Sequence, residues 1–227
     1  MTYAIIVAGG QGRRMGAAEP KQYLELDGVP IVVRTLLIFQ QSGLFEKVIL
    51  VLPEHDTELR GAGIRSHASL ETLEFVAGGA TRQASVYNAL NALKPFAEDD
   101  DIICIHDAVR PLVDVVQVKA CIEAAGKYGA AVLGLPVNET VKRCDAAGRI
   151  LETVPRDGLW LARTPQTARF GLLWQAHMAA FAGGVSATDD AVLLEYRNIP
   201  VYMVKGSADN IKITEPDDLL LAKKLLR

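Results

Sequence analysis

Short apolar runs, rich in β-branched residues, recur along the chain and predict buried strands. They cover residues 4–7, 48–52, 102–105 and 131–135. None of them alternates between apolar and polar positions, which is typical of strands that helices cover on both faces. Segments with helical periodicity lie between and after these runs, at residues 30–42, 81–93, 115–128, 170–181, 188–196 and 216–226. The alternation predicts a doubly wound, Rossmann-like α/β fold, with a mostly parallel sheet and helices on both faces.

Residues 137–155 interrupt this alternation. They have the pattern of two strands around an Asp145-Ala146-Ala147-Gly148 turn, which predicts a β-hairpin. Because an isolated two-stranded hairpin is only marginally stable in water, it needs a surface to pack against. Either it folds back on its own domain, or it projects as an arm that pairs with a second subunit. We predict the arm, and we treat residues 1–227 as one domain with 137–155 inserted for dimerisation.

Composition and charge narrow the range of partners. The 227 residues are 50% hydrophobic, and their charges nearly cancel to a formal net charge of −3. This balance gives no overall attraction to nucleic acid or to an anionic membrane, so we expect neither partner. The chain has no secretion signal at its start and no apolar run near the roughly 20 residues of a membrane-spanning helix. Three widely spaced cysteines are typical of reduced thiols, and together these features predict a cytoplasmic protein.

A glycine-rich loop with cations directly follows the first predicted strand. Its glycines include Gly9, Gly10 and Gly12, and Arg13, Arg14 and then Lys21 come after them. Open α/β sheets place their ligand crevice at such a strand end. The spacing matches neither the dinucleotide-binding fingerprint nor the P-loop, which argues against a dehydrogenase or a P-loop kinase. Backbone N–H groups beside arginine and lysine suit a triphosphate.

Three further segments carry polar groups at predicted strand ends or turns. Asp107, after the strand at 102–105, could bind magnesium directly or through water, whereas His106 beside it is more typical of a structural histidine. Residues 78–85 repeat the pattern of a strand followed by glycines that open a helix. There the Ser85 hydroxyl could read a base edge and Arg82 could meet a phosphate. Residues 208–214 pair an acid with a lysine, which alone would suggest a surface turn.

Together these segments resemble the 2-C-methyl-D-erythritol 4-phosphate cytidylyltransferase family. The likeness extends over nearly the whole chain, because seven motifs occur in the family's order. They lie at residues 12–15, 20–23, 106–111, 156–160, 164–166, 188–190 and 208–212. The first motif alone would indicate only a nucleotidyltransferase.

The resemblance implies a reaction and a role for each matching residue. CTP and methylerythritol phosphate would give 4-diphosphocytidyl-2-C-methyl-D-erythritol and pyrophosphate, with magnesium as cofactor. The expected catalytic residues are Arg14, Lys21 and Lys212. The expected nucleotide-binding residues are Ala8, Gly9, Gly10, Gly12, Arg13, Gly79, Arg82, Ser85, Asp107 and Ala108. The expected acceptor-binding residues are Asp107, Arg110, Thr140, Arg156, Thr164, Thr188 and Lys212.

Magnesium would be held by the CTP phosphates, with Asp107 as a ligand directly or through water. The resemblance also implies a homodimer formed by arm exchange, in which Thr140 and Arg156 reach the acceptor from the partner subunit. Two positions depart from the family pattern. Gly9 stands where relatives often have Ala, and Ala80 stands where many have an acidic residue near the nucleoside.

Two alternatives remain beside this function. A ribitol-5-phosphate cytidylyltransferase would share the fold and nucleotide loop, but Arg156 and the arm residues Thr140 and Lys142 favour methylerythritol phosphate as acceptor. A non-catalytic nucleotide sensor would need the nucleotide site alone. The sequence contains Arg14, Lys21, Asp107 and Lys212 together, whereas a sensor could lose the cations that oppose charge in the transition state.

Overall fold

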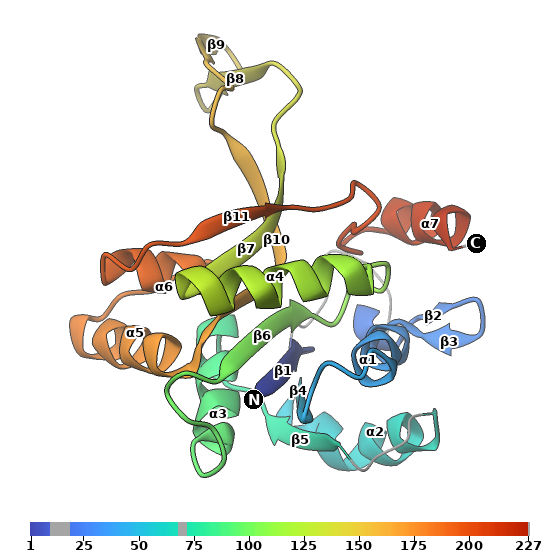
Figure 1. Cartoon of the computed structure of the whole chain (residues 1–227). Coiled ribbons are helices and arrows are strands. Elements are labelled where there is room, and N and C mark those ends of the chain that lie inside the picture. Colours follow the sequence, from blue (N-terminus) through green and yellow to red (C-terminus); the bar gives the residue numbers. More distant parts are fainter. Residues whose placement is uncertain (10–18, 68–71, 227) are drawn as a thin grey trace.

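A seven-stranded sheet forms the centre of the computed structural model, which describes residues 1–9, 19–67 and 72–226 (Figure 1). Its strands are β1 (Thr2–Val7), β4 (Lys47–Leu52), β5 (Leu73–Ala77), β6 (Ile102–Asp107), β7 (Ala130–Pro136), β10 (Trp160–Arg169) and β11 (Tyr202–Lys205). They lie in the order β11-β7-β10-β6-β1-β4-β5. Only β10 runs antiparallel to its neighbours, β6 and β7. The prediction of a mostly parallel, doubly wound sheet is confirmed.

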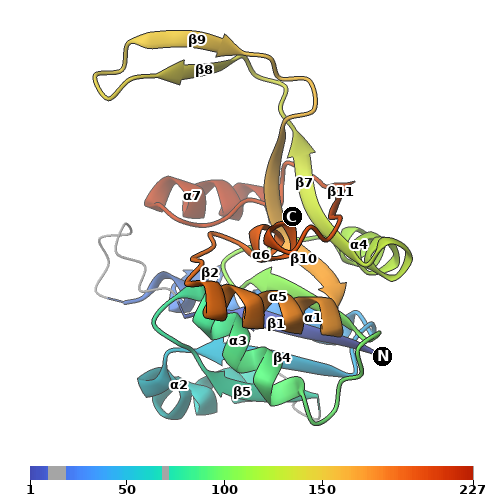
Figure 2. The same ribbon diagram turned by 90° about the vertical axis from the view of Figure 1, so that its left-hand side faces the viewer.

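Helices cover both faces of this sheet (Figure 2). They are α1 (Ile31–Gln41), α2 (Glu54–His67), α3 (Arg82–Leu93), α4 (Val115–Tyr128), α5 (Phe170–Gly183), α6 (Asp190–Tyr196) and α7 (Pro216–Leu225). Helices α1 and α4 pack on one face, and α3, α5 and α6 pack on the other. A short 3-10 helix, η2 (Lys21–Tyr23), precedes the small β2 (Glu25–Leu26) and β3 (Val29–Pro30) pair. In the parts of the chain that the structure describes, no helix has both the length and the apolar character that crossing a bilayer requires.

Capping residues explain why the ends of one helix were predicted correctly and the start of another was not. Helix α4 begins after Asp114, whose side chain accepts a hydrogen bond from Val116 N at 2.8 Å, and it ends at Gly129 with φ +93°. The expected start of α6 at residue 188 was wrong, because the Asp189 side chain caps the helix and Asp190 is its first residue. Helix α2 and strands β10 and β11 had not been expected. Helix α2 is polar on most sides, so the sequence gives little helical periodicity there.

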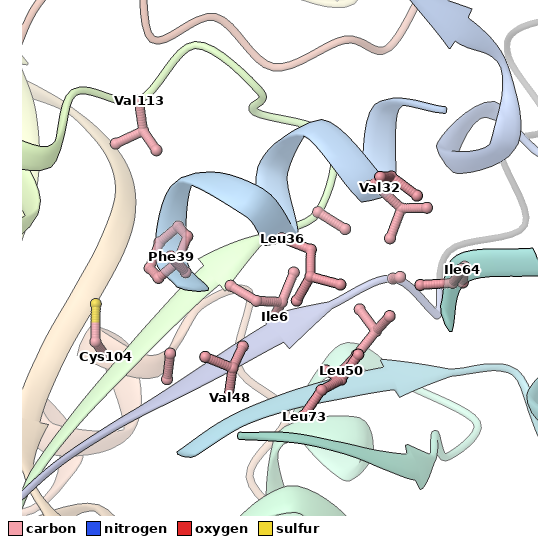
Figure 3. Packing of buried hydrophobic residues seen from close by; sticks show 14 of the residues in the cluster. Ile6, Val32, Leu36, Phe39, Val48, Leu50, Ile64, Leu73, Cys104 and Val113 are labelled. Carbon is pink, nitrogen blue, oxygen red and sulfur yellow. The ribbon is translucent and has the colours of Figure 1, made fainter. Parts of the chain in front are cut away.

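The core consists of two apolar layers, one on each face of the sheet. Along β1, Ala4 and Ile6 belong to one layer, while Tyr3 and Ile5 belong to the other. In the first layer Leu36, from α1, packs against the sheet (Figure 3). This double burial accounts for the continuous apolar runs, because the central strands β1, β4 and β6 have almost no solvent-facing side. The free thiols of Cys104 and Cys121 are buried, and that of Cys144 is exposed.

A β-hairpin projects from the end of the sheet. Strands β8 (Val141–Cys144) and β9 (Ile150–Val154) pair with each other, beyond the ends of β7 and β10 and away from the helices (Figures 1 and 2). Ile150 and Leu151 are 59% and 53% exposed. The hairpin therefore does not fold back on its own domain. Its pairing with a second subunit stays a prediction.

Candidate active site

The candidate site lies at the carboxyl ends of β1 and β6, where the strand order reverses. From β1 the chain moves outward through β4 and β5, and then returns to β6 on the other side of β1. Loops at such a point diverge and leave a crevice. A cavity of about 1010 Å³ opens here, and its wall includes Ala8, Gly9, Lys21, Gly79, Arg82, Ser85, Asp107 and Lys212. The structure therefore brings eight of the predicted site residues together around one cavity, although they come from five separate segments.

A second, smaller cavity adjoins the first. It has a volume of about 230 Å³ and includes Arg110, Thr164 and Thr188 in its wall. Arg82, Asp107 and Lys212 line both cavities. These three side chains therefore stand at the junction between a large chamber and a small one.

Four predicted residues, Gly10, Gly12, Arg13 and Arg14, lie outside the described residues. The described segment that follows them, residues 19–23, contacts the rest of the fold. Gln22 donates a hydrogen bond to the Ala8 carbonyl at 2.9 Å, and the Tyr23 hydroxyl donates to Asp56 Oδ2 at 2.8 Å. Arg60 of α2 lies over the Tyr23 ring at 4.5 Å and forms an ion pair with Glu19. Contacts on both sides of Lys21 thus hold this lysine at the cavity wall.

The turn before α3 brings backbone close to the cavity. Thr81 caps α3, and Gly79 N donates a hydrogen bond to Ser85 Oγ at 3.1 Å. A Cβ at Gly79 would lie 2.5 Å from the Ala84 Cβ, so only glycine fits. The buried Ser85 hydroxyl also donates to the Thr81 carbonyl at 2.9 Å. In this structure Ser85 shapes the turn, while the helix N-terminus offers partial positive charge to an anion.

Asp107 is the negative centre of the junction. Its carboxylate lies 2.9 Å from Lys212 Nζ, 3.2 Å from Arg110 Nε and 3.6 Å from Arg82 Nε. Burial raises the pKa of Asp107, but the charges of Lys212 and the two arginines outweigh burial and hold the pKa well below its usual range. One ionised carboxylate thus faces three cations. The excess positive charge suits phosphate groups.

His106, near the end of β6, is hydrogen-bonded to two neighbouring segments. Its Nδ1 lies 3.1 Å from the Thr164 hydroxyl, and its Nε2 lies 3.2 Å from the Arg110 carbonyl. The same Thr164 oxygen accepts a hydrogen bond from Asp107 N at 3.1 Å. Burial lowers the pKa of His106 to about 4, so the ring is neutral at neutral pH. These contacts confirm the structural role expected for His106.

The loop before α7 places Lys212, through residues that the sequence analysis had not assigned. Buried Asn210 donates a hydrogen bond to the Thr164 carbonyl at 2.8 Å, and its own carbonyl accepts from Arg110 Nη1 at 3.0 Å. Arg163 donates to the same carbonyl at 2.6 Å. Asn210 lies in the 208–212 motif, but its role depends on partners far away in sequence. Only the folded chain shows that it positions the lysine.

Three predicted residues lie elsewhere. Ala108 lines neither cavity, because it is fully buried and its carbonyl accepts a hydrogen bond from Thr35. Thr140 and Arg156 are exposed, next to the hairpin strands β8 and β9 in sequence, and line neither cavity of their own chain. Their contact with an acceptor therefore stays a prediction that requires a second subunit.

The junction does not form a magnesium cage from protein groups. Among the described residues, no three His, Cys, Asp or Glu side chains come together as metal ligands. Both oxygens of Asp107 already face cations. Magnesium prefers several oxygen ligands and often takes them from substrate phosphates. The residues present fit an ion that arrives with a nucleotide better than an ion resident in the protein.

The doubly wound sheet, the cavity at the carboxyl ends of β1 and β6 and the cationic junction define an α/β protein of the nucleotidyltransferase class. A family model described as IspD, 2-C-methyl-D-erythritol 4-phosphate cytidylyltransferase, matches residues 2–227. The chain belongs to this family.

Relatives and solved structures agree with this assignment. The 2-C-methyl-D-erythritol 4-phosphate cytidylyltransferase of Syntrophus aciditrophicus is 42% identical over 99% of this chain and 95% of that protein. The chloroplastic protein of the same name from Oryza sativa is 40% identical over 98% of this chain and 73% of that protein. The crystal structure of the Francisella tularensis protein of that name has a TM-score of 0.85 and 33% identity, and covers 98% of both chains. The sequence relatives and the solved structure therefore point to the same family.

Proposed function

We propose that the protein transfers a cytidylyl group from CTP to 2-C-methyl-D-erythritol 4-phosphate. The products are 4-diphosphocytidyl-2-C-methyl-D-erythritol and pyrophosphate. The observation that carries this proposal is the junction, where Arg82, Asp107 and Lys212 line both cavities. The larger chamber suits a nucleoside triphosphate and the smaller one a sugar phosphate. The reacting groups would meet at the side chains that the two chambers share.

The reaction needs cations more than it needs a base. An oxygen of the acceptor phosphate attacks the α-phosphorus, the bond to the β-phosphate oxygen breaks, and pyrophosphate leaves. Because the second pKa of a phosphate monoester is about 6, the attacking group is already ionised at neutral pH. The barrier comes from bringing two anions together and from charge that builds up around phosphorus. Lys21 and Lys212, with Arg14, would oppose that charge.

Magnesium enters this proposal as part of the substrate. We expect the ion to arrive bound to the triphosphate oxygens, where it neutralises part of their charge. Asp107 would then act mainly on the protein's own cations, by keeping Lys212 and Arg110 at the junction. Any contact of Asp107 with the ion would be through water.

The hairpin arm supplies the rest of the acceptor site in our proposal. Arg156 is exposed on this arm, and the apolar side chains of Ile150 and Leu151 on β9 are exposed as well. Exposed apolar side chains on a projecting hairpin favour burial against a second copy of the chain. In such a homodimer, Thr140 and Arg156 of one subunit would complete the small cavity of the other.

The first experiment measures pyrophosphate release by the purified protein with magnesium and CTP. Release with methylerythritol 4-phosphate, but not with ribitol 5-phosphate, is the expected result. Release with ribitol 5-phosphate alone would keep the chemistry and replace the acceptor. No release with either acceptor would refute the transferase and favour the nucleotide sensor.

A mixing experiment tests the arm. At an acceptor concentration well below the parent KM, Arg156→Ala and Lys212→Ala chains are each expected to be nearly inactive. If arms are exchanged, a mixed dimer contains one site with both defects and one intact site. After subunits re-equilibrate in an equal mixture, about half of the dimers are mixed, so about a quarter of all sites are intact. The mixture should therefore recover about a quarter of the parent activity. If each arm serves its own chain, no site in the mixture is intact. Failure of the mixture to recover activity would therefore refute arm exchange.

A further inference from the structure

Arg82 has an unusual position among the cations of the junction. It is the first residue of α3 and lines both cavities, and its side chain is 24% exposed. Two carboxylates face it from different elements. Asp107 lies on the cavity side, with 3.6 Å between its Oδ1 and Arg82 Nε. Asp190 lies behind, with 2.8 Å between its Oδ2 and Arg82 Nη1. Arg82 therefore lies closer to Asp190, which lines neither cavity, than to Asp107.

Asp190 is almost fully buried, and its backbone is hydrogen-bonded to β10. It is the first residue of α6, and only 2% of its side chain is exposed. Its backbone N–H donates a hydrogen bond to Gln166 Oε1 at 2.8 Å, and the Gln166 amide in turn donates to the Asp189 cap at 2.9 Å. Strand β10 therefore fixes the start of α6. The carboxylate of Asp190 has little freedom to follow Arg82 if the arginine moves.

His177 is the other titratable group beside Asp190, and it does not supply a positive charge in place of Arg82. His177 Nε2 lies 3.9 Å from Asp190 Oδ1 and is fully buried. Burial lowers the pKa of His177, so this ring is neutral at neutral pH. Among the described residues, Arg82 is therefore the cation that balances the buried charge of Asp190. A buried charge with one partner strongly opposes separation of that pair.

We propose that Asp190 is a positioning residue, whose buried carboxylate holds the Arg82 guanidinium between the two cavities. This inference rests on the proposed function. Without the charge of Asp190, Arg82 would turn towards Asp107 and compete with Lys212 and Arg110 for that carboxylate. With Asp190 in place, the Arg82 side chain is already ordered before the substrates bind. Substrate binding then loses less side-chain conformational entropy. Sequence reasoning assigned Thr188 in the 188–190 motif and missed the aspartate two residues on.

The test is a double-mutant cycle that measures steady-state pyrophosphate release. Asp190→Asn keeps the side-chain volume and removes the charge, and Arg82→Ala removes the group that it is said to hold. We expect Asp190→Asn to lower kcat/KM roughly tenfold in the parent, and by less than about twofold when Arg82 is already Ala. The loss should lie mainly in kcat, because Lys21 and the Gly79 backbone still bind the nucleotide. Glu195→Gln, an exposed change on the same helix, is the matched control and should leave kcat/KM unchanged.

Thermal unfolding adds a readout that does not depend on turnover. Arg82→Ala leaves the buried Asp190 unpaired, so adding Asp190→Asn should raise the melting temperature of that variant. Equal losses of kcat/KM in both backgrounds, or no loss in the parent, would overturn the inference while the proposed function stands. A parent protein without any pyrophosphate release would overturn the proposed function and this inference with it.

Discussion

Replacing Asp107 with Asn tests the electrostatics of the junction most directly. The change keeps the shape of the side chain but removes the negative charge that three cations share. The side chains of Arg110, Arg82 and Lys212 are 10%, 24% and 41% exposed. Removal of one partner from a buried pair costs roughly 3–5 kcal/mol, and we take the lower end, about 3 kcal/mol, because solvent screens the lysine. For a chain of this length this corresponds to a melting temperature about 6–12 °C lower.

The pH dependence of this loss has a definite sign. The pKa of Asp107 in the folded protein is well below its usual range, whereas in the unfolded chain it is about 3.9. A depressed folded pKa contributes stability that is complete above the unfolded pKa and disappears as the pH falls through the folded pKa. The free energy of unfolding of the parent should therefore exceed that of Asp107→Asn by a constant amount from about pH 8 to pH 5. The difference should shrink only below about pH 4.

Urea unfolding at several pH values measures this difference, with Glu195→Gln as an exposed control that should stay within about 0.5 kcal/mol of the parent. Inorganic phosphate should restore part of the lost stability of Asp107→Asn, because an anion can replace the missing charge. Equal stability of the variant and the parent at pH 7 would refute the reasoning. So would a difference that disappears between pH 8 and pH 5.

Three further predictions concern single side chains. Lys21→Ala should lower kcat roughly 10²–10³-fold with a smaller change in KM, because the lysine opposes charge in the transition state; unchanged turnover in steady-state kinetics would contradict this role. Tyr23→Phe should reduce the free energy of unfolding by about 1–3 kcal/mol in urea titrations, because the buried Asp56 loses its hydrogen-bond donor; full stability would show that this contact is dispensable. Arg156→Ala should raise KM for the sugar phosphate and leave KM for CTP unchanged, whereas equal effects on both would exclude an arm that touches only the acceptor.

The sequence alone determined the fold class and the place of the site, because both depend on short-range patterns. Continuous apolar runs such as 102–105 mark strands buried on both faces. Glycines and cations directly after the first strand mark a ligand crevice, because the carboxyl ends of parallel strands meet at one edge of a sheet. Caps such as Asp114 also act within one turn of a helix, so the bounds of α4 could be predicted.

Only the tertiary structure decided which side chains meet. Asp190 pairs with Arg82, and Asn210 bonds to Thr164, yet no local pattern links the members of either pair. Helix α2 was missed for a related reason. Its contribution lies in particular contacts, such as that of Asp56 with Tyr23, and not in an apolar face that a periodic pattern would show. Packing brings distant segments together at particular distances, and the charges and hydrogen bonds of the site depend on those distances.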